Sequence, residues 1–185
     1  MTQRIALVTG GTGGIGSAIC EALADLGMKV VAGYSNEEKA LAWQADQKAA
    51  GYDFLIQHVD VTSLESCQQA VAAITATTGA TIDVLVNNAG ITRDGFFKKM
   101  AWDQWHAVMS TNLDSAFNMT RPVIEAMLDK KWGRIINISS VNGEKGQMGQ
   151  ANYSAAKAGI HGFTKALAQE GARNGVTVNT ISPGY

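Results

Sequence analysis

The sequence predicts an α/β fold in which a single domain is built on one doubly wound parallel sheet. Short β-rich runs alternate along the chain with longer segments of helical periodicity, and this alternation is typical of parallel strands joined by right-handed crossovers. Several of the short runs are almost continuously apolar, as expected when helices cover both faces of a sheet. The length of 185 residues fits one domain, and no Pro- or Gly-rich linker divides it.

Each expected element follows from its local pattern. The runs rich in aliphatic residues predict strands at residues 5–8, 29–32, 54–58, 84–87, 134–139 and 177–182. The segments between them predict helices at about residues 14–26, 37–50, 63–77, 102–129 and 153–173. The fourth of these is one helix, or two that meet near Pro122. Glycines cluster at the strand ends, where tight turns and ligands are expected.

Composition excludes several classes of function. The net charge is −1 and no long basic run occurs, which argues against a nucleic-acid or membrane-surface role. The first apolar run is too short for a signal peptide or a membrane span, so we expect a cytoplasmic protein. Cys20 and Cys67 are expected to be buried free thiols. His58, His106 and His161 are scattered without ligand spacing, so no metal site is predicted.

A glycine-rich loop separates the first strand from the first helix. It reads Gly10-Gly11-Thr12-Gly13-Gly14-Ile15-Gly16. Glycines let the chain turn sharply and let a pyrophosphate approach the backbone, while the helix N-terminus presents free N–H groups to the anion. Many strand-to-helix turns are rich in glycine, but the position after the first strand of a βαβ unit favours a dinucleotide site of Rossmann type.

Tyr153 and Lys157 are four residues apart on a predicted helix and therefore share one face. An ammonium near a phenol lowers its pKa and makes it a better general acid. Taken alone, the pair is equally consistent with an ordinary surface pair. Ser139 and Ser140 end the fifth strand, at the edge of the sheet where ligands bind in open α/β folds. Asn112 lies inside a predicted helix, where an Asn by itself indicates only local backbone hydrogen bonding.

Together these motifs resemble the short-chain dehydrogenase/reductase family. The spacing Gly10-x3-Gly14-x-Gly16 after Thr9 is similar to the phosphate loop of that family. Three further stretches agree in the same order along the chain. They are Asn87-Asn88-Ala89-Gly90, Ser140 followed by Tyr153-x3-Lys157, and Pro183-Gly184.

The resemblance implies reduction of a carbonyl by hydride transfer from a nicotinamide dinucleotide. In that scheme Tyr153 donates the proton, Ser140 orients the substrate oxygen, Lys157 tunes the phenol and holds the ribose, and Asn112 holds a water that relays protons. The cofactor is implied to contact Gly10, Thr12, Gly13, Gly14, Ile15, Gly16, Asp60, Val61, Asn88, Ala89, Gly90, Tyr153, Lys157, Pro183 and Gly184.

The end of the second strand indicates which dinucleotide is used. NAD-specific sites usually carry an acidic residue there, whereas this stretch reads Gly33-Tyr34-Ser35-Asn36 and reaches its first acid only at Glu37. The absence of a carboxylate favours NADP(H), with Ser35 and Lys39 as candidate contacts to the 2′-phosphate; NAD(H) is the alternative. A second interpretation of residues 35–38 is a helix capping box.

Within the family, residues 143–150, residues 91–94 and Pro183-Gly184-Tyr185 resemble acetoacetyl-CoA reductases. Those enzymes form (R)-3-hydroxybutyryl-CoA for polyhydroxyalkanoate synthesis. The implied substrate contacts are Asp94, Ser140, Gln147, Met148, Gln150, Tyr153 and Tyr185. The alternative is a 3-oxoacyl-[acyl-carrier-protein] reductase, which shares residues 91–94 and the catalytic residues. A third interpretation is a dinucleotide-binding subunit without turnover.

The resemblance also bears on chain length and assembly. Members of the family continue beyond the Pro-Gly pair with a helical segment that covers the substrate, and with a seventh strand. We therefore expect the 185 residues to form the dinucleotide-binding and catalytic part of a longer enzyme. We expect the full enzyme to be a homo-oligomer, most simply a tetramer.

Overall fold

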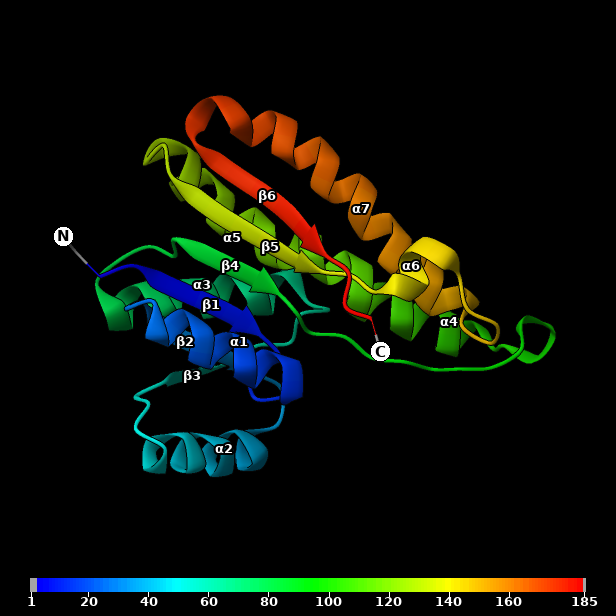
Figure 1. Ribbon diagram of the computed structural model, residues 1–185, viewed down its shortest axis with the longest axis horizontal. Coiled ribbons are helices and arrows are strands. Elements are labelled where there is room, and N and C mark those ends of the chain that lie inside the picture. The colour runs from blue at the N-terminus through cyan, green and yellow to red at the C-terminus, as the bar shows by residue number, and fades with distance from the viewer. Residues whose placement is uncertain (1–2, 185) are drawn as a thin grey trace.

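Six parallel strands form one sheet in the computed structural model, which describes residues 3–184 (Figure 1). The strand order is β3-β2-β1-β4-β5-β6, so the chain starts in the middle of the sheet and builds outward in both directions. This order leaves a crevice between β1 and β4 at the carboxyl ends of the strands. The strands are β1 (Ile5–Thr9), β2 (Lys29–Tyr34), β3 (Leu55–His58), β4 (Val84–Asn87), β5 (Gly133–Ile138) and β6 (Val176–Ile181).

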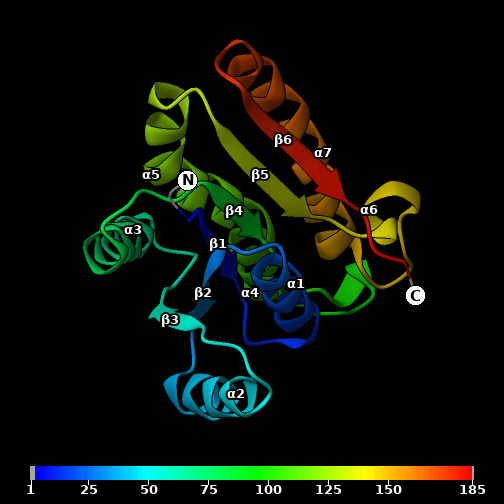
Figure 2. The same ribbon diagram turned by 60° about the vertical axis from the view of Figure 1, so that its left-hand side comes forward.

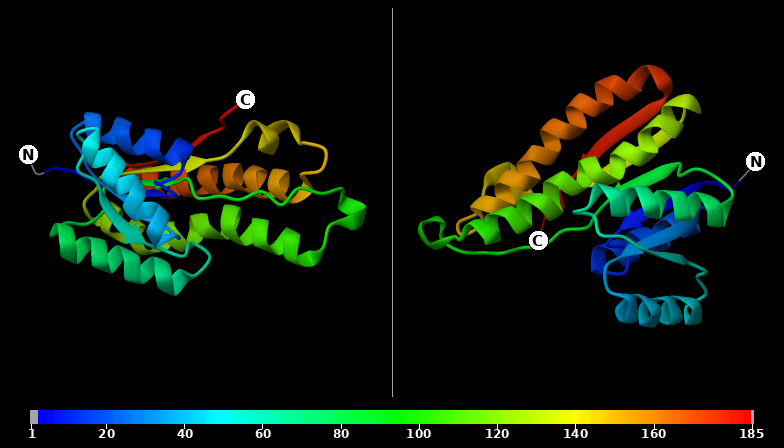
Figure 3. Two further views of the ribbon diagram at one scale, coloured as in Figure 1. Left: turned by 90° about the horizontal axis from the view of Figure 1, so that it is seen from below. Right: turned by 180° about the vertical axis from the view of Figure 1, so that it is seen from behind.

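Helices cover both faces of the sheet, as the apolar strands predict (Figure 3). The helix α1 (Gly14–Asp25) packs on one face, with α2 (Glu37–Ala49) beside β3. On the other face lie α3 (Leu64–Thr78), α5 (Ser115–Asp129) and α7 (Ala151–Gly171). The long helix α7 runs alongside β6 (Figure 2). The two short helices α4 (Trp102–Met109) and α6 (Val141–Lys145) lie beyond the carboxyl ends of the strands.

The core consists of two apolar layers separated by the sheet. Alternate residues of β1 point to opposite faces: Ile5 and Leu7 join the layer under α3 and α5, whereas Ala6 and Val8 join the layer under α1. All four are at most 3% exposed. Burial on both faces is why the strand sequences show continuous apolar runs rather than alternation.

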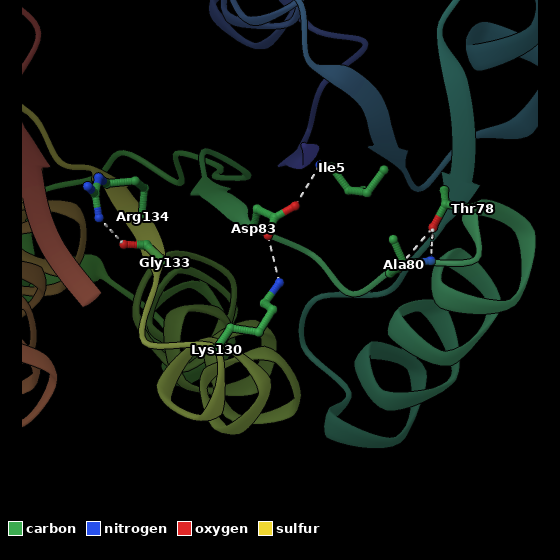
Figure 4. Close-up of polar contacts among 7 residues, drawn as sticks. All are labelled: Ile5, Thr78, Ala80, Asp83, Lys130, Gly133 and Arg134. Carbon is green, nitrogen blue, oxygen red and sulfur yellow. Dashed lines mark hydrogen bonds and ion pairs between the residues drawn. The ribbon is translucent and has the colours of Figure 1, made fainter. Parts of the chain in front are cut away.

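Asp83, just before β4, joins elements at the end of the sheet where the strands begin (Figure 4). One carboxylate oxygen accepts the Ile5 N–H at 2.9 Å and the other accepts Lys130 Nζ at 2.6 Å. The carboxylate thus joins the starts of two strands to the end of α5. These contacts lie at the opposite end of the strands from the glycine loop.

The structure corrects the expected fourth helix. Residues 102–129 remain helical throughout, but they do not divide at Pro122, which lies inside α5. The irregularity is instead a π-helical segment, η2 (Ser110–Asp114), between α4 and α5. Short helices at Phe97–Lys99 and α6 were not expected, and other element bounds differ by one or two residues. None of the helices in the described part of the chain is long and apolar enough to cross a membrane.

Candidate functional site

The glycine loop closes on itself at the carboxyl end of β1. Gly10 has a φ of +61°, which glycine adopts without strain. A Cβ added at Gly16 would overlap the Gly10 carbonyl oxygen, whereas one added at Gly14 would meet nothing within 4 Å. No side chain caps the N-terminus of α1, and its first turn carries no acidic residue. The first N–H groups of α1 therefore face open space beside a bare backbone, which is the environment that a pyrophosphate needs.

Asn88 and Thr9 tie this loop to the end of β4. The Asn88 amide donates to the carbonyls of Thr9 and Gly10, at 3.0 and 3.1 Å. Thr9 Oγ1 in turn accepts the N–H groups of Asn88 and Ala89, both at 3.0 Å. The predicted contact residue Asn88 thus fixes the shape of the phosphate loop, and it also lines the cavity that contains Tyr153.

A cavity of about 320 Å³ lies beside the loop, between the ends of β2 and β4. Its walls include the predicted residues Gly10, Ser35, Asp60, Val61, Ala89 and Gly90. Two hydrogen bonds from Thr62 lower the pKa of the Asp60 carboxyl, which therefore stays ionised as an acceptor. The cavity suits an adenosine, with its apolar walls provided by Val59 and Val61.

The predicted capping box over residues 35–38 does not form, because α2 begins one residue later with a simple N-cap. Asn36, not Ser35, caps α2, and its side chain accepts the Lys39 N–H at 2.9 Å. Ser35 is exposed at the wall of the 320 Å³ cavity, which is called the adenosine-side cavity below. Lys39 is exposed and is not among the residues that line this cavity, so the structure does not bring it together with Ser35 there.

A second cavity, of about 380 Å³, lies on the other side of Gly90 and Ile91. It brings together Ser140, Tyr153 and Lys157 with the glycine-loop residue Ile15 and with Pro183 and Gly184. With the lining residues of the 88–92 segment, they come from five separate parts of the chain, which meet because the carboxyl ends of parallel strands share one edge. Both cavities include Gly90 and Ile91, so together they form an extended crevice across the switch point between β1 and β4.

Among the described lysine, arginine and histidine side chains, Lys157 has the pKa that departs most from its ordinary value. Its side chain is buried, and desolvation lowers the pKa of its ammonium to about 8. Nζ donates to the Ile138 carbonyl at 2.7 Å and lies 5.7 Å from the centre of the Tyr153 ring. The helical spacing of four residues therefore places the two groups together, as expected.

The π-helical segment explains the position of Asn112. An extra residue in the turn directs this side chain out of the regular helical ladder, and it is buried against the backbone of Ile91. Asn112 Oδ1 accepts the Ile91 N–H at 2.7 Å, and Nδ2 donates to the Ile91 carbonyl at 2.8 Å. Asn112 thus orders the segment that separates the two cavities, although it does not itself line the second one.

Ser140 is held with its hydroxyl hydrogen available. It caps α6, and its Oγ accepts the Asn142 N–H at 3.1 Å. Because that bond uses an oxygen lone pair, the O–H is left to donate into the cavity. Tyr153 is half-buried in the first turn of α7 and faces the same cavity.

The predicted substrate contacts are only partly brought together. Gln150 Nε2 donates to Asp94 at 3.0 Å, and its Oε1 accepts from Asn142 at 3.0 Å. Gln150 therefore links the loop after β4 to α6, close to Ser140. Gln147 and Met148 are exposed on the neighbouring loop, with Met148 79% accessible. Tyr185 lies outside the described residues.

Sequence reasoning missed several residues that support the site. Ser139 was considered only as an alternative to Ser140, yet its buried hydroxyl contacts the main chain of α7. Asn152, fully buried, donates to the carbonyls of Arg93 and Gln104 and so anchors the turn that carries Tyr153. The only available signal was that both residues adjoin a predicted catalytic residue.

These features fit a nicotinamide dinucleotide. The bare backbone at the N-terminus of α1 suits the pyrophosphate, and the cavities on either side suit an adenosine and a nicotinamide. Among the described residues, no cluster of three His, Cys, Asp or Glu side chains could hold a metal ion. An acid, a hydroxyl donor and a buried cation around one cavity suit proton transfer to a carbonyl oxygen.

Comparison with known proteins agrees with this chemistry. Residues 4–185 match the short chain dehydrogenase family. The chain is 58% identical to the acetoacetyl-CoA reductase of Cupriavidus necator, over all of this chain and 75% of the relative. It is 59% identical to the acetoacetyl-CoA reductase of Allochromatium vinosum, over 98% of this chain and 74% of the relative. Identity to the 3-oxoacyl-[acyl-carrier-protein] reductase of Vibrio cholerae is 47%, over 98% and 73%. The chain therefore belongs to the short chain dehydrogenase family and is an oxidoreductase with a Rossmann-type fold.

Proposed function

We propose that this protein reduces the 3-oxo group of acetoacetyl-CoA to give (R)-3-hydroxybutyryl-CoA, a precursor of polyhydroxyalkanoates. The observation that carries the proposal is the convergence of Ser140, Tyr153 and Lys157 on one cavity, in a chain 51–59% identical to several acetoacetyl-CoA reductases. The dinucleotide supplies the hydride when it is bound, and the protein supplies orientation and the proton.

In this proposal each side chain has a separate task. Ser140 donates its hydroxyl hydrogen to the substrate oxygen, since its bond with the Asn142 N–H uses one of two acceptor lone pairs and not the O–H. Tyr153 gives a proton to the same oxygen as the alcohol forms. Lys157 stabilises the phenolate that remains and binds the nicotinamide ribose. Asn112 holds the Ile91 backbone in place and orders a water that returns a proton toward Lys157.

We propose NADP(H) as the cofactor. The support is that β2 ends at Tyr34 without a carboxylate, and that the hydroxyl of Ser35 lies at the wall of the adenosine-side cavity. A carboxylate at this position would repel a 2′-phosphate. The remaining contacts in this proposal are those expected from the sequence, except for Lys39, which is not among the residues that line the cavity.

The assembly and cellular location are part of the same proposal. We propose a homotetramer, which is supported by the exposed aromatic side chains Phe96, Phe97, Trp102 and Phe117, each at least 51% accessible. A cytoplasmic location is supported by the two free, buried cysteines. Light scattering coupled to size-exclusion chromatography tests the assembly.

Oxidation of NADPH, followed by absorbance with acetoacetyl-CoA as substrate, tests the activity. We expect turnover, and a product of R configuration on chiral analysis. A higher kcat/KM for an acetoacetyl-acyl-carrier-protein would favour the reading supported by the Vibrio cholerae relative. Binding of dinucleotide without turnover of either thioester would favour the non-catalytic subunit and contradict the proposal.

A further inference from the structure

Two consecutive residues at the end of β5 hold Lys157 at two different points. The Ile138 carbonyl accepts Lys157 Nζ at 2.7 Å. The next residue, Ser139, is 3% exposed, and its Oγ donates to the main-chain carbonyl of Lys157 at 2.8 Å. The strand therefore fixes both the ammonium and the backbone of the same residue.

The hydroxyl of Ser139 also accepts a hydrogen bond from His161, as the directions of its two contacts show. A hydroxyl oxygen and a carbonyl oxygen 2.8 Å apart need a proton between them, so the single Ser139 hydrogen points to the Lys157 carbonyl. His161 Nε2 lies 3.1 Å from the same Oγ and must therefore carry the proton of that contact. His161 is one turn after Lys157 on α7. Ser139 thus binds two successive turns of the helix.

Close packing against α6 also restricts movement of α7 at Lys157. A Cβ added at Gly143 would lie 2.8 Å from the Lys157 carbonyl carbon and 2.9 Å from its Cβ. Such distances are too short for side chains, so the backbone of α6 packs directly on Lys157. The residue is confined by β5 on one side and by α6 on the other.

We propose that Ser139 is a positioning residue, which fixes the main chain of Lys157 so that its ammonium stays between the Ile138 carbonyl and the Tyr153 ring. Ser139 also lines the cavity that contains Tyr153, but its hydroxyl is already used in two hydrogen bonds and is therefore not directed to the substrate. The inference rests on the proposed function, in that Lys157 acts together with Tyr153. It adds that the two serines at the end of β5 have different tasks, with Ser140 toward the substrate and Ser139 toward the helix.

Ser139→Ala removes the anchor, and Ser139→Thr keeps a hydroxyl at the same place. Thr180→Val is the matched control, because Thr180 Oγ1 donates to Thr164 on the same helix at 2.6 Å without touching Lys157. For each full chain we would measure kcat against pH with acetoacetyl-CoA, the thermal midpoint, and the titration of the Lys157 ammonium by NMR. The NMR measurement needs no turnover, so it tests the anchor separately from the activity.

For Ser139→Ala we expect a fall in kcat of roughly 2- to 12-fold, the equivalent of one lost hydrogen bond. We also expect the Lys157 titration to move upward, toward that of a solvated lysine, since a released side chain reaches water. Ser139→Thr should restore both, and Thr180→Val should lower the midpoint without moving the titration. An unchanged Lys157 titration in Ser139→Ala would overturn the inference. The unmodified chain could fail to reduce acetoacetyl-CoA while Ser139→Ala still shifts the titration of the Lys157 ammonium. That result would support the positioning role of Ser139 and contradict the proposed activity.

Discussion

Lys157 places an ammonium in a buried environment, and the cost of this burial predicts how one substitution will act. Below its folded pKa of about 8 the residue is charged in both the folded and the unfolded chain. Above about pH 10.5, the ordinary lysine value, it is neutral in both. Between these values the unfolded chain binds more protons, so the free energy of unfolding rises with pH. The free-energy cost of burying the charged ammonium therefore applies in full below about pH 8 and disappears by about pH 10.5.

We therefore expect Lys157→Met to raise the free energy of unfolding at pH 7 by about 1–3 kcal/mol. The gain is partly offset because the Ile138 carbonyl loses its donor. Reductase activity should be lost. Urea unfolding at pH 7 and at pH 10 measures the effect, which should shrink at the higher pH. A gain that is equal at both pH values would contradict the burial argument.

Tyr153→Phe separates proton transfer from binding. The substitution removes only the hydroxyl, so the ring can keep its contact with Lys157. We expect kcat to fall about 10²–10⁴-fold, as is typical for a lost general acid. Dinucleotide affinity, measured by fluorescence titration, should change little. Near-normal turnover of this variant would exclude Tyr153 as the proton donor.

At the scale of elements, the glycine loop makes opposite predictions for two neighbouring glycines. Gly16→Ala places a Cβ on the Gly10 carbonyl oxygen, so the loop must open and stability should fall. Gly14→Ala meets nothing within 4 Å in the free protein and should stabilise it by up to about 1 kcal/mol through helix propensity. Its methyl group would nevertheless stand where the pyrophosphate approaches.

Thermal unfolding of these two variants, with and without cofactor, distinguishes a folding role from a binding role. We expect Gly14→Ala to keep or raise the midpoint of the free protein while weakening dinucleotide binding. Gly16→Ala should lower both. If Gly14→Ala binds cofactor as well as the unmodified chain does, the pyrophosphate does not lie over this turn.

Asp83 gives an element-scale prediction at the opposite edge of the sheet, where it joins β1 and α5 (Figure 4). Asp83→Ala leaves the N–H of the buried residue Ile5 without its acceptor, so we expect a loss of about 1–3 kcal/mol in the free energy of unfolding. Lys130→Met is the control. It removes only a partly exposed ion pair, which is worth at most about 1 kcal/mol. Denaturation and kinetics together test this, and kcat should be unchanged in both variants.

The elements also show what a sequence can and cannot predict. Strand positions followed from apolar runs, because burial on both faces leaves a strong signal in one dimension. The π-helical segment at Ser110–Asp114 was missed, because it occurs together with a contact of Asn112 with Ile91 across the fold, which no local pattern reveals. Of the two alternatives for residues 102–129, the one with two helices that meet near Pro122 is wrong, because Pro122 is accommodated within α5. Local propensity therefore failed where a tertiary contact decides the helix geometry.

At the scale of the molecule, the sequence predicted the positions of site residues that regular helices and strands hold. It did not predict the positions of those that irregular loops carry. Tyr153 and Lys157 share one helix, and Ser140 closely follows β5, whose neighbours are fixed by the sheet order, so all three meet at one cavity. Gln147 and Met148 lie on an exposed loop, whose course no periodic pattern determines. Ser35 and Lys39 were both candidate contacts to a 2′-phosphate, but the cap formed by Asn36 orders the first turn of α2, and only Ser35 lines the cavity.

Dinucleotide binding should stabilise the whole molecule, because the two cavities join β1, β2 and β4 with α7 across the switch point. A ligand that binds only the folded chain adds about 2.7 kcal/mol at a concentration of 100 Kd. At equal concentrations we therefore expect a larger rise in thermal midpoint with NADP(H) than with NAD(H). Equal or reversed shifts would contradict the proposed preference.

Ser35→Asp sharpens this measurement, because Ser35 lies at the wall of the adenosine-side cavity. A carboxylate there repels a 2′-phosphate and accepts hydrogen bonds from free ribose hydroxyls. The variant should therefore lose most of the midpoint shift given by NADP(H) and gain shift with NAD(H). Lys39→Gln is the matched control: it removes a charge from α2 at a residue that does not line this cavity, so both shifts should stay as they are. A loss of the NADP(H) shift in Lys39→Gln alone would mean that α2 rearranges to bring this cation to the phosphate.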